Sequence, residues 1–291
     1  MKPAPFDYVA PTTLDEVIRA LQAGDGEAKI LAGGQSLMPM LNMRLARPSQ
    51  LIDLARIPEL DAIREENGRI YIGAMTTKRS VERSSLVAAR QPLLHEATKN
   101  IAHPQIRNRG TMGGSMAHAD PAAEYPAVAV ALDAEMRILG PSGERKIAAR
   151  DFFITYLTTA LEPDEVLAEI SFPVHREQDG WSFQEFSRRH GDFAMTGAAI
   201  TCARNGTGSY DAARIVLFGV SPTPLRASEA EERLRGEAPS EELHREVAEA
   251  IGQGIEEPLS DTHASAEYRR QLATVCCRRG LDEASARASS H

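Results

Sequence analysis

The chain has 291 residues, 42% of them hydrophobic and 25% charged, and this composition is typical of a globular protein. The length predicts two domains rather than one small core. The formal net charge of −8 makes nucleic acid a poor candidate for a partner. No stretch approaches the roughly 18 consecutive apolar residues of a membrane-spanning helix, so no span is expected.

The N-terminus and the cysteines narrow the possible classes of protein further. Residues 1–5 lack the apolar core of a signal peptide, which favours a cytoplasmic location. The three cysteines, Cys202, Cys276 and Cys277, are an odd number without regular spacing. This argues against a disulfide framework, and also against an iron–sulfur cluster, which generally has four ligands. We interpret Cys276 and Cys277 as packing residues of a helix.

The first half of the chain predicts a mixture of helices and short strands. Apolar residues at three- and four-residue spacing indicate a helix that begins at Thr12 or Thr13 and ends near Gly24. The dipeptide Asn67-Gly68 is typical of a hairpin turn. The other expected elements are strands at 28–32, 51–54 and 69–73, a loop turning into a short helix within 35–44, helical segments across 76–100 with a break near Pro92, and a helix within 121–132.

The second half predicts strands followed by helices. The expected elements are a hairpin around 140–143, strands at 166–172, 181–187, 198–203 and 214–220, and helical stretches at 226–253 and 264–287. The pattern changes at the polar segment 175–180. The predicted fold class is therefore α+β, with an N-terminal domain of residues 1–176 and a smaller C-terminal domain of residues 177–291.

Two glycine-rich segments are the strongest candidates for a ligand site. The first comprises Ala32, Gly33, Gly34, Gln35, Ser36 and Leu37, and the second comprises Gly110, Thr111, Met112, Gly113, Gly114 and Ser115. Glycine permits positive φ and lets the backbone approach a ligand closely. Successive N–H groups in such a turn form a concavity that binds anions. We expect both segments to be loops that together hold the two phosphates of a dinucleotide.

Other ligand sites fit these residues less well. Neither segment is a G-x-G-x-x-G fingerprint after a strand, which argues against a Rossmann fold, and neither contains the G-K-[ST] of a nucleoside triphosphatase. A pair of glycines is also compatible with an ordinary tight turn, but two similar segments favour a ligand. His118 and Asp120 lack a third ligand, so no metal is expected.

The same segments resemble those of a known family. Residues 32–46, AGGQSLMPMLNMRLA, and residues 104–124, PQIRNRGTMGGSMAHADPAAE, resemble the FAD-binding (medium) subunit of molybdenum hydroxylases. This family contains the carbon monoxide dehydrogenase medium chain and relatives in the xanthine dehydrogenase superfamily. Residues 72–77, 189–194 and 267–279 are also similar, so the resemblance covers nearly the whole chain.

The resemblance implies a fold and a set of cofactor contacts. The N-terminal domain is expected to have the FAD-binding fold of the vanillyl-alcohol oxidase (PCMH) type, in two α+β subdomains that hold FAD between them. A smaller α/β domain follows. Residues 32–36 and 111–115 are expected to line the pyrophosphate, and Asp120 the ribityl or ribose hydroxyls. The remaining residues of the expected cofactor-binding set are Leu37, His118, Asp192 and Phe193.

Several residues depart from the family's usual pattern or allow two interpretations. Phe193, where relatives often have Tyr or Trp, is either a ring packed on the isoalloxazine or an ordinary core phenylalanine. Glu185 stands where many relatives carry lysine, so a contact made by that lysine is in doubt here. Met112 replaces the more usual Ile or Leu. Arg107 and Arg109 either neutralise the diphosphate or are solvated surface residues.

The function implied by the resemblance is electron transfer. A large partner subunit with a molybdenum cofactor hydroxylates a substrate, a small partner with [2Fe–2S] clusters passes electrons on, and FAD in this chain delivers them to a quinone, NAD or O₂. The expected assembly is a dimer of heterotrimers, with no catalytic acid–base pair in this chain. The alternatives are a self-contained flavin oxidase, for which the region after residue 176 is small, and a nonenzymatic scaffold without FAD.

Overall fold

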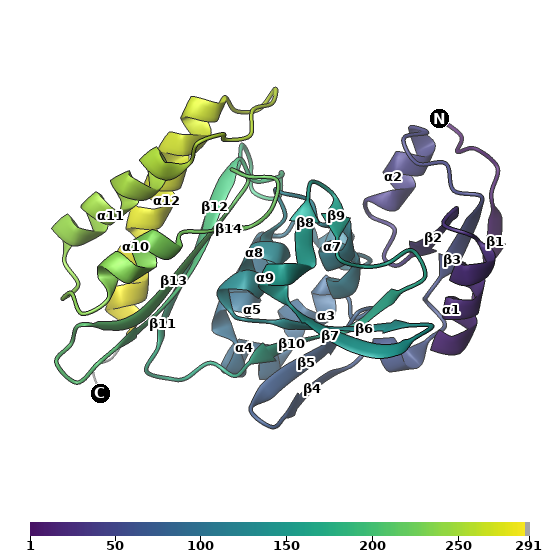
Figure 1. Cartoon of the computed structure of the whole chain (residues 1–291), viewed down its shortest axis with the longest axis horizontal. Coiled ribbons are helices and arrows are strands. Elements are labelled where there is room, and N and C mark those ends of the chain that lie inside the picture. Colours follow the sequence, from purple (N-terminus) through teal and green to yellow (C-terminus); the bar gives the residue numbers. More distant parts are fainter. Residues whose placement is uncertain (289–291) are drawn as a thin grey trace.

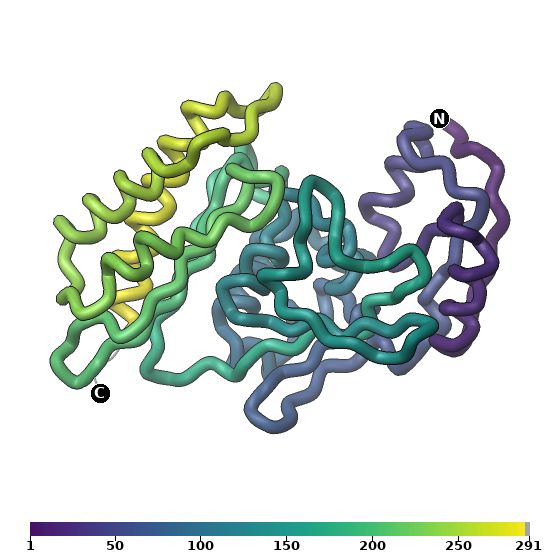
Figure 2. Tube along the Cα trace, viewed as in Figure 1, coloured from purple at the N-terminus to yellow at the C-terminus, as the bar shows by residue number. Residues whose placement is uncertain are grey.

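The structure, a computed structural model, describes residues 1–288, which contain three sheets and one isolated two-stranded hairpin (Figure 1). The N-terminal sheet lies at one end, the five-stranded sheet in the centre, and the C-terminal sheet with its helices at the other end. The N-terminus and the end of the last helix therefore lie at opposite ends of the molecule (Figure 2). This mixture of helix and sheet has the predicted α+β class.

The N-terminal sheet is parallel, in the order β1-β3-β2. Its elements are β1 (Asp7–Val9), α1 (Leu14–Ala23), β2 (Ala28–Leu31), α2 (Leu37–Asn42) and β3 (Gln50–Asp53). Thr13 caps α1 by accepting a hydrogen bond from the Glu16 N–H, and Val17 and Leu21 bury the inner face of this helix. The first glycine-rich segment connects β2 to α2, so it begins where a strand ends.

The central sheet is antiparallel, in the order β4-β5-β10-β6-β7. Its strands are β4 (Ile63–Glu66), β5 (Arg69–Gly73), β6 (Glu135–Gly140), β7 (Gly143–Ala148) and β10 (Val166–Pro173). Strand β10 is the middle strand and is buried along almost its whole length. The remaining short elements are η1 (Pro58–Leu60), α9 (Ala149–Phe152), and the hairpin of β8 (Phe153–Thr155) and β9 (Thr158–Thr159).

Six helices lie between β5 and β6 in the chain. They are α3 (Lys78–Arg83), α4 (Ser85–Arg90), α5 (Pro92–Asn100), α6 (Pro104–Arg107), α7 (Met112–His118) and α8 (Glu124–Ala131). All eight residues of α8 are buried, including the charged residue Glu124. The second glycine-rich segment runs into α7, so it lies at the start of a helix.

The C-terminal sheet is antiparallel and carries its helices together on one face (Figure 1). Its elements are β11 (Gly180–Phe186), β12 (Thr196–Arg204), β13 (Tyr210–Phe218), β14 (Leu225–Arg226), α10 (Ser228–Leu234), α11 (Glu241–Gly254) and α12 (Ala266–Arg287). Cys276 and Cys277 on α12 are fully buried in the core between helix and sheet. This confirms that they are packing residues.

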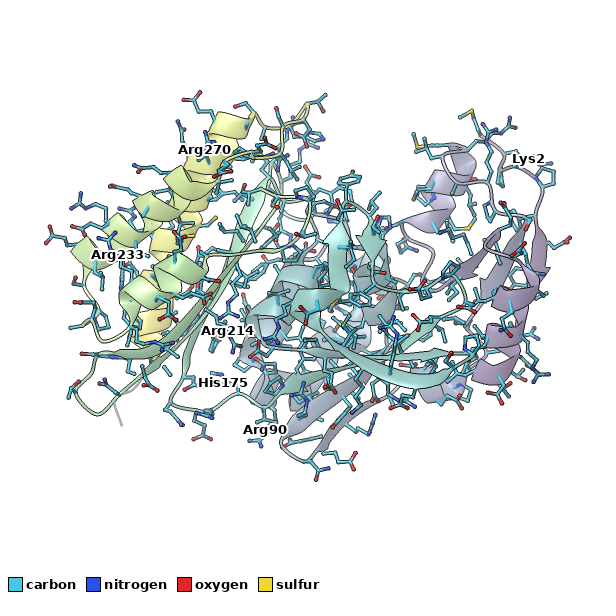
Figure 3. The ribbon with its side chains drawn as sticks, in the orientation of Figure 1. Lys2, Arg90, His175, Arg214, Arg233 and Arg270 are labelled. Carbon is cyan, nitrogen blue, oxygen red and sulfur yellow. The ribbon has the colours of Figure 1, made fainter. Side chains whose placement is uncertain are left out.

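Side-chain and backbone contacts fix the C-terminal sheet and the segment that leads into it against the central part. Arg214 on β13 donates to the carbonyl oxygen of Ala131 at 3.2 Å and forms an ion pair with Asp133; Figure 3 shows it between the two parts. The His175 N–H donates to the carbonyl oxygen of Arg90 at 2.8 Å. The Gly219 N–H donates to the carbonyl oxygen of Pro121, also at 2.8 Å. The C-terminal sheet is thereby held beside the segment that links α7 to α8.

Most predicted elements are confirmed, and the differences have local causes. The single helical stretch predicted for 226–253 is two helices, because Gly236 adopts a φ of +82° and Pro239 follows it. Strand β1 and the β8–β9 hairpin were not predicted, since they are too short for a clear alternating pattern. No helix within residues 1–288 is long and apolar enough to cross a bilayer.

Candidate cofactor site

The two glycine-rich segments, called here the first motif (residues 32–37) and the second motif (residues 110–115), lie directly against each other. A Cβ atom on Gly33 would lie 2.2 Å from the carbonyl oxygen of Arg109 and 2.7 Å from the Cα atom of Gly110. A Cβ atom on Gly114 would lie 3.4 Å from the Cβ atom of Ala32. Glycine permits this approach because it has no side chain. Segments distant in sequence thus form one site.

The first motif offers a row of free backbone donors. Within residues 1–288, the N–H groups of Gly33, Gly34, Gln35 and Ser36 have no protein acceptor at hydrogen-bonding distance. Gly34 has a φ of +72°, and the side-chain amide of Gln35 donates to the carbonyl oxygen of Gly33 at 3.2 Å, which holds the turn. Consecutive free donors in a turn bind anions well. This geometry suits a diphosphate.

The second motif differs from the prediction, because it is not a loop with free donors. Thr111 is the N-cap of α7, and its Oγ1 accepts a hydrogen bond from the Gly114 N–H at 3.0 Å. The N–H groups of Met112 and Gly113 donate to the carbonyl oxygens of Thr76 and Ala74, both at 2.9 Å. These three donors are therefore used inside the protein. Thr111 and Gly113 are buried, whereas Gly114 and Ser115 are partly exposed.

The side chains of Met112 and Arg107, in and beside the second motif, also differ from expectation. The Met112 side chain is fully buried in the hydrophobic core, so it packs inward. Arg107 is buried rather than solvated; it pairs with Glu82 at 3.1 Å and donates to the carbonyl oxygens of Ile101 and Ala102 at 2.8 Å each. Since these partners occupy its guanidinium group, Arg107 is not available to neutralise a diphosphate. Arg109 is exposed.

His118 and Asp120 lie where α7 ends. Ala119 between them is left-handed with a φ of +50°, and Asp120 Oδ1 accepts a hydrogen bond from the Ala122 N–H at 2.8 Å. Burial lowers the pKa of His118, which favours the neutral imidazole. Among residues 1–288 there is no group of three or more His, Cys, Asp or Glu side chains suited to a metal ion.

The loop with Asp192 and Phe193 comes from the C-terminal sheet and packs against Ala102 and His103, which precede α6. Gly191 adopts a φ of +91°, and a Cβ atom on it would lie 2.5 Å from the ring of His103, next to α6. The side chain of Phe193 is 72% exposed. The interpretation of Phe193 as a core phenylalanine is therefore wrong, and the ring is free to cover a ligand.

A group of partly to fully buried ionisable side chains lies near the second motif, and sequence reasoning did not identify the group. Its members are Lys78 on α3, Glu124 on α8 and Glu185 on β11. Burial raises the pKa of both carboxyl groups, and the charge of Glu124 raises that of Glu185 further. Burial lowers the pKa of Lys78. The available sequence signal was the single acidic residue in an otherwise apolar helix pattern, residues 121–132.

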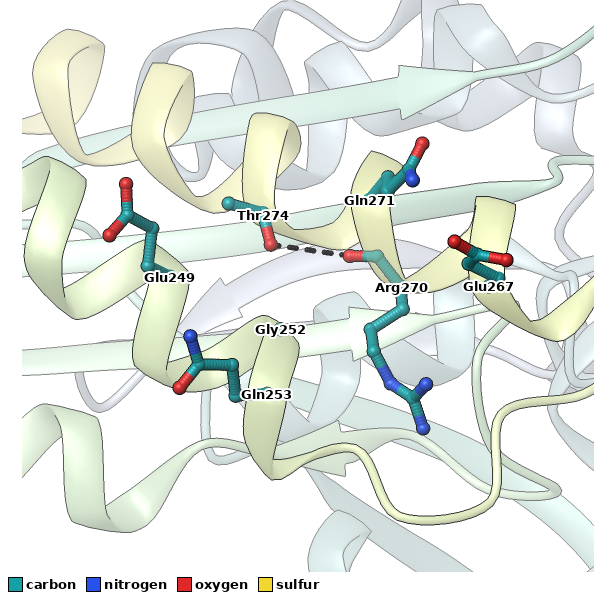
Figure 4. A pocket seen from close by; sticks show the side chains of 7 residues that line it. All are labelled: Glu249, Gly252, Gln253, Glu267, Arg270, Gln271 and Thr274. Atoms are coloured by element: carbon teal, nitrogen blue, oxygen red, sulfur yellow. Dashed lines mark hydrogen bonds between the residues drawn. The ribbon is translucent and has the colours of Figure 1, made fainter.

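A separate groove of about 470 Å³ lies between α11 and α12 (Figure 4). Its lining is polar and includes Glu249, Arg270 and Thr274, whose hydroxyl donates to the carbonyl oxygen of Arg270 at 3.2 Å. All of its lining residues belong to these two helices. It is therefore not part of the site formed by the two motifs.

Comparison with known proteins decides the family. Residues 4–175 match the FAD binding domain in molybdopterin dehydrogenase, and residues 181–284 match the CO dehydrogenase flavoprotein C-terminal domain. The chain belongs to the FAD-binding medium subunits of the molybdenum hydroxylases. FAD is therefore the cofactor of this medium subunit, and its activity is that of an oxidoreductase component.

Individual relatives of this medium subunit match it along its full length. It is 42% identical to the 6-hydroxypseudooxynicotine dehydrogenase complex subunit alpha of Paenarthrobacter nicotinovorans, covering 99% of this chain and 97% of the relative. It is 41% identical to the carbon monoxide dehydrogenase medium chain of Hydrogenophaga pseudoflava, covering 99% of each. The solved carbon monoxide dehydrogenase of that organism superposes with a TM-score of 0.96 over 99% of this chain and all of that chain, at 42% identity.

Proposed function

We propose that this medium subunit takes electrons from a small partner subunit with [2Fe–2S] clusters and passes them through FAD to an external acceptor. The observation that supports the proposal is the row of free N–H donors at residues 33–36, packed against the second motif. Bound FAD supplies both one- and two-electron chemistry. Since three cysteines cannot provide the usual four ligands, the clusters belong to another subunit.

We assign different parts of FAD to different residues of the site. We assign the diphosphate to the first motif, from Ala32 to Leu37, because its donors are free. We assign Ser115 and the backbone of Gly114, which are partly exposed, to the other side of the same space, while Thr111 and Gly113 support this segment from inside the protein. We assign Asp120 and His118 to the ribityl or ribose hydroxyls, with Asp192 beside the ring.

The C-terminal loop contributes the ring that faces the isoalloxazine. Phe193 is exposed on a loop that packs on His103, close to the second motif, and we assign it to the flavin face. An aromatic ring in this place excludes water from the cofactor. The proposed function needs no acid–base residue for substrate chemistry in this chain, because the hydroxylation occurs on the partner with the molybdenum cofactor.

We propose a heterotrimer with a large molybdenum subunit and a small [2Fe–2S] subunit, assembled as a dimer of heterotrimers. The names of relatives support a multi-subunit enzyme, since they are subunits or medium chains of dehydrogenases. The substrate of the complex is not encoded in this chain. Relatives are named for substrates as different as carbon monoxide and caffeine.

The test measures how electrons reach the flavin. The chain is purified with FAD and mixed without oxygen with a dithionite-reduced small subunit from the same organism, after excess dithionite is removed. We expect the flavin absorbance to bleach in proportion to the small subunit added. Bleaching that does not depend on the small subunit would contradict the proposal, and a chain that takes up no FAD would contradict the site itself.

A further inference from the structure

The exposed apolar side chains of the chain gather on two short segments. Of the ten large hydrophobic side chains exposed within residues 1–288, six come from these segments. They are Met38, Met43 and Leu45 on and just after α2, and Ile154, Tyr156 and Leu157 on the β8–β9 hairpin. Single exposed apolar residues are ordinary, but a group of them on one surface marks an interaction site.

Both segments adjoin the cofactor site. Helix α2 begins at Leu37, the last residue of the first motif, and a Cβ atom on Gly34 would lie 3.3 Å from the Met38 Cγ atom. Strand β9 contacts α7, the helix that contains most of the second motif. Figure 1 shows α2 and the hairpin at the same edge of the molecule. A partner bound to this edge would therefore contact the neighbours of both motifs.

The hairpin holds its apolar tip in a fixed position. Its base is anchored by Phe152 and Phe153, which are buried and form an edge-to-face pair with ring centroids 5.2 Å apart. The Ala160 N–H donates to the carbonyl oxygen of Phe152 at 2.9 Å and closes the hairpin. At the tip, Leu157 has a φ of +51°, a conformation that strains leucine more than glycine or asparagine. Strained residues of this kind are concentrated at functional sites.

The charges of the two segments indicate the chemistry of the partner. Residues 152–161 contain no charged side chain, and residues 30–52 contain only Arg44 and Arg47 before Asp53, although 25% of the whole chain is charged. Both arginines are exposed, and among the described residues neither forms an ion pair with a carboxylate. An apolar surface bordered by free arginines fits a protein surface that is apolar with acidic residues at its border.

We propose that α2 and the β8–β9 hairpin form the docking surface for the small [2Fe–2S] subunit. The proposal rests on the proposed function, because electrons that leave another subunit must enter at the cofactor site, which this surface adjoins. The hairpin tip and α2 supply the apolar contact, and Arg44 and Arg47 pair with acidic residues of the small subunit. A second copy of this chain fits this surface poorly, since residues 30–52 and 152–161 offer these arginines no carboxylate.

The contact is tested by calorimetric titration of the FAD-loaded chain with the small subunit from the same organism. Tyr156→Ala removes an exposed aromatic ring of the kind that dominates protein interfaces, so we expect the affinity to fall at least about tenfold. Tyr268→Ala is the matched control, because it truncates an exposed tyrosine on α12. Equal affinities of the two variants would overturn the docking surface alone. A wild type that does not bind the small subunit would overturn the proposed function as well.

Leu157→Asn should have two effects of opposite sign. Asparagine adopts positive φ with less strain than leucine, so the free variant should unfold at the same urea concentration as the wild type or at a higher one. Loss of the apolar side chain should weaken binding of the small subunit about fivefold or more. A variant that unfolds at lower urea concentration but binds like the wild type would show that Leu157 is a structural residue, which contradicts the proposal.

The arginines are tested by the salt dependence of association. Added salt should slow association of the wild type with the small subunit, and it should do so less in Arg47→Gln. The control Arg278→Gln, which changes an exposed arginine on α12, should keep the salt dependence of the wild type. The same salt dependence in Arg47→Gln as in the control would contradict the pairing of the arginines.

Flavin bleaching by the reduced small subunit separates docking from electron transfer. In Tyr156→Ala, bleaching should be slow at low concentrations of the small subunit and should recover the wild-type rate at saturation. A rate that stays slow at saturation would place Tyr156 in the electron-transfer step and overturn its docking role. Binding of the wild type to anionic phospholipid vesicles, or self-association in size exclusion, that Tyr156→Ala abolishes would assign the surface to a membrane or to a second copy, which also overturns the proposal.

Discussion

At the scale of single residues, the glycines of the two motifs serve different purposes. Gly34 needs positive φ, so it sets the direction of the free N–H groups around it. Gly33, Gly113 and Gly114 instead allow segments to touch, because a Cβ atom on any of them would meet another part of the chain. The two motifs therefore need glycine for two different physical reasons. One is a backbone conformation with positive φ, and the other is the absence of a side chain where two segments touch.

The conformational requirement predicts the behaviour of Gly34→Ala. Positive φ costs a residue with a side chain about 1–2 kcal/mol, and relief of this strain turns the neighbouring N–H groups away from the phosphates. We expect FAD affinity to fall at least about tenfold, which corresponds to about 1.4 kcal/mol. Gly26→Ala is the matched control, since Gly26 also has positive φ but no atom near its Cβ position. Titration with FAD measures the affinity of each variant, and urea denaturation measures its stability. Equal losses of FAD affinity in Gly34→Ala and Gly26→Ala would contradict the assignment of Gly34 to the phosphate site.

At the scale of elements, the start of α7 is bound to the segment after β5 and is not a loop with free N–H donors. Its first N–H groups bind the carbonyl oxygens of Ala74 and Thr76, so the helix start is attached to the segment that follows β5. A Cβ atom on Gly113 would lie 2.4 Å from the Cβ atom of Ala74 and 2.7 Å from its Cα atom. The position of the second motif beside the first motif depends on this contact.

The close contact between Gly113 and Ala74 predicts that Gly113→Ala destabilises the fold. Inserting a methyl group into a packed contact costs about 1–3 kcal/mol. We expect this loss in the free energy of unfolding, measured by urea denaturation without FAD. Gly254→Ala is the control, because Gly254 ends a helix with open space around it and should lose no stability. If Gly113→Ala unfolds like the wild type, the contact with Ala74 is looser than the structure indicates.

At the scale of the whole molecule, the C-terminal domain packs against the helices of the N-terminal half. Its sheet is held beside α8 by Arg214 and by the Gly219 N–H. Its loop packs on His103 through Gly191, and the charge of Glu124 on α8 raises the pKa of Glu185 on β11. The two halves are therefore in direct contact through several elements.

The exposure of Phe193 gives a prediction for this arrangement. Phe193→Ala removes a ring that is mostly exposed, so the stability without FAD should change by less than about 0.5 kcal/mol. Loss of ring packing on the flavin should weaken FAD binding by about 0.5–1.5 kcal/mol. Tyr268→Ala, which truncates an exposed aromatic on α12, is the control for both measurements. Calorimetric melting and FAD titration check the pair of outcomes, and unchanged affinity would mean that Phe193 does not contact the cofactor.

The sequence by itself determined most of the elements, the candidate residues of the cofactor site and the family. Apolar spacing predicted α1, and the run of apolar residues predicted β10, because the periods of helices and strands are local properties. The two glycine-rich segments could also be recognised locally, since each requires glycine at fixed positions. Their resemblance to a family then supplied FAD as the cofactor, which the family comparison bears out.

Only the tertiary structure decided how those residues are used. The donors of the second motif bind Ala74 and Thr76, Arg107 is paired with Glu82, and Phe193 is exposed rather than in the core. Glu124 and Glu185 are 61 residues apart (185 − 124) on different elements, yet the charge of Glu124 raises the pKa of Glu185. Hydrogen bonding, burial and charge depend on which distant segments pack together, and local spacing along the chain carries no information about that packing.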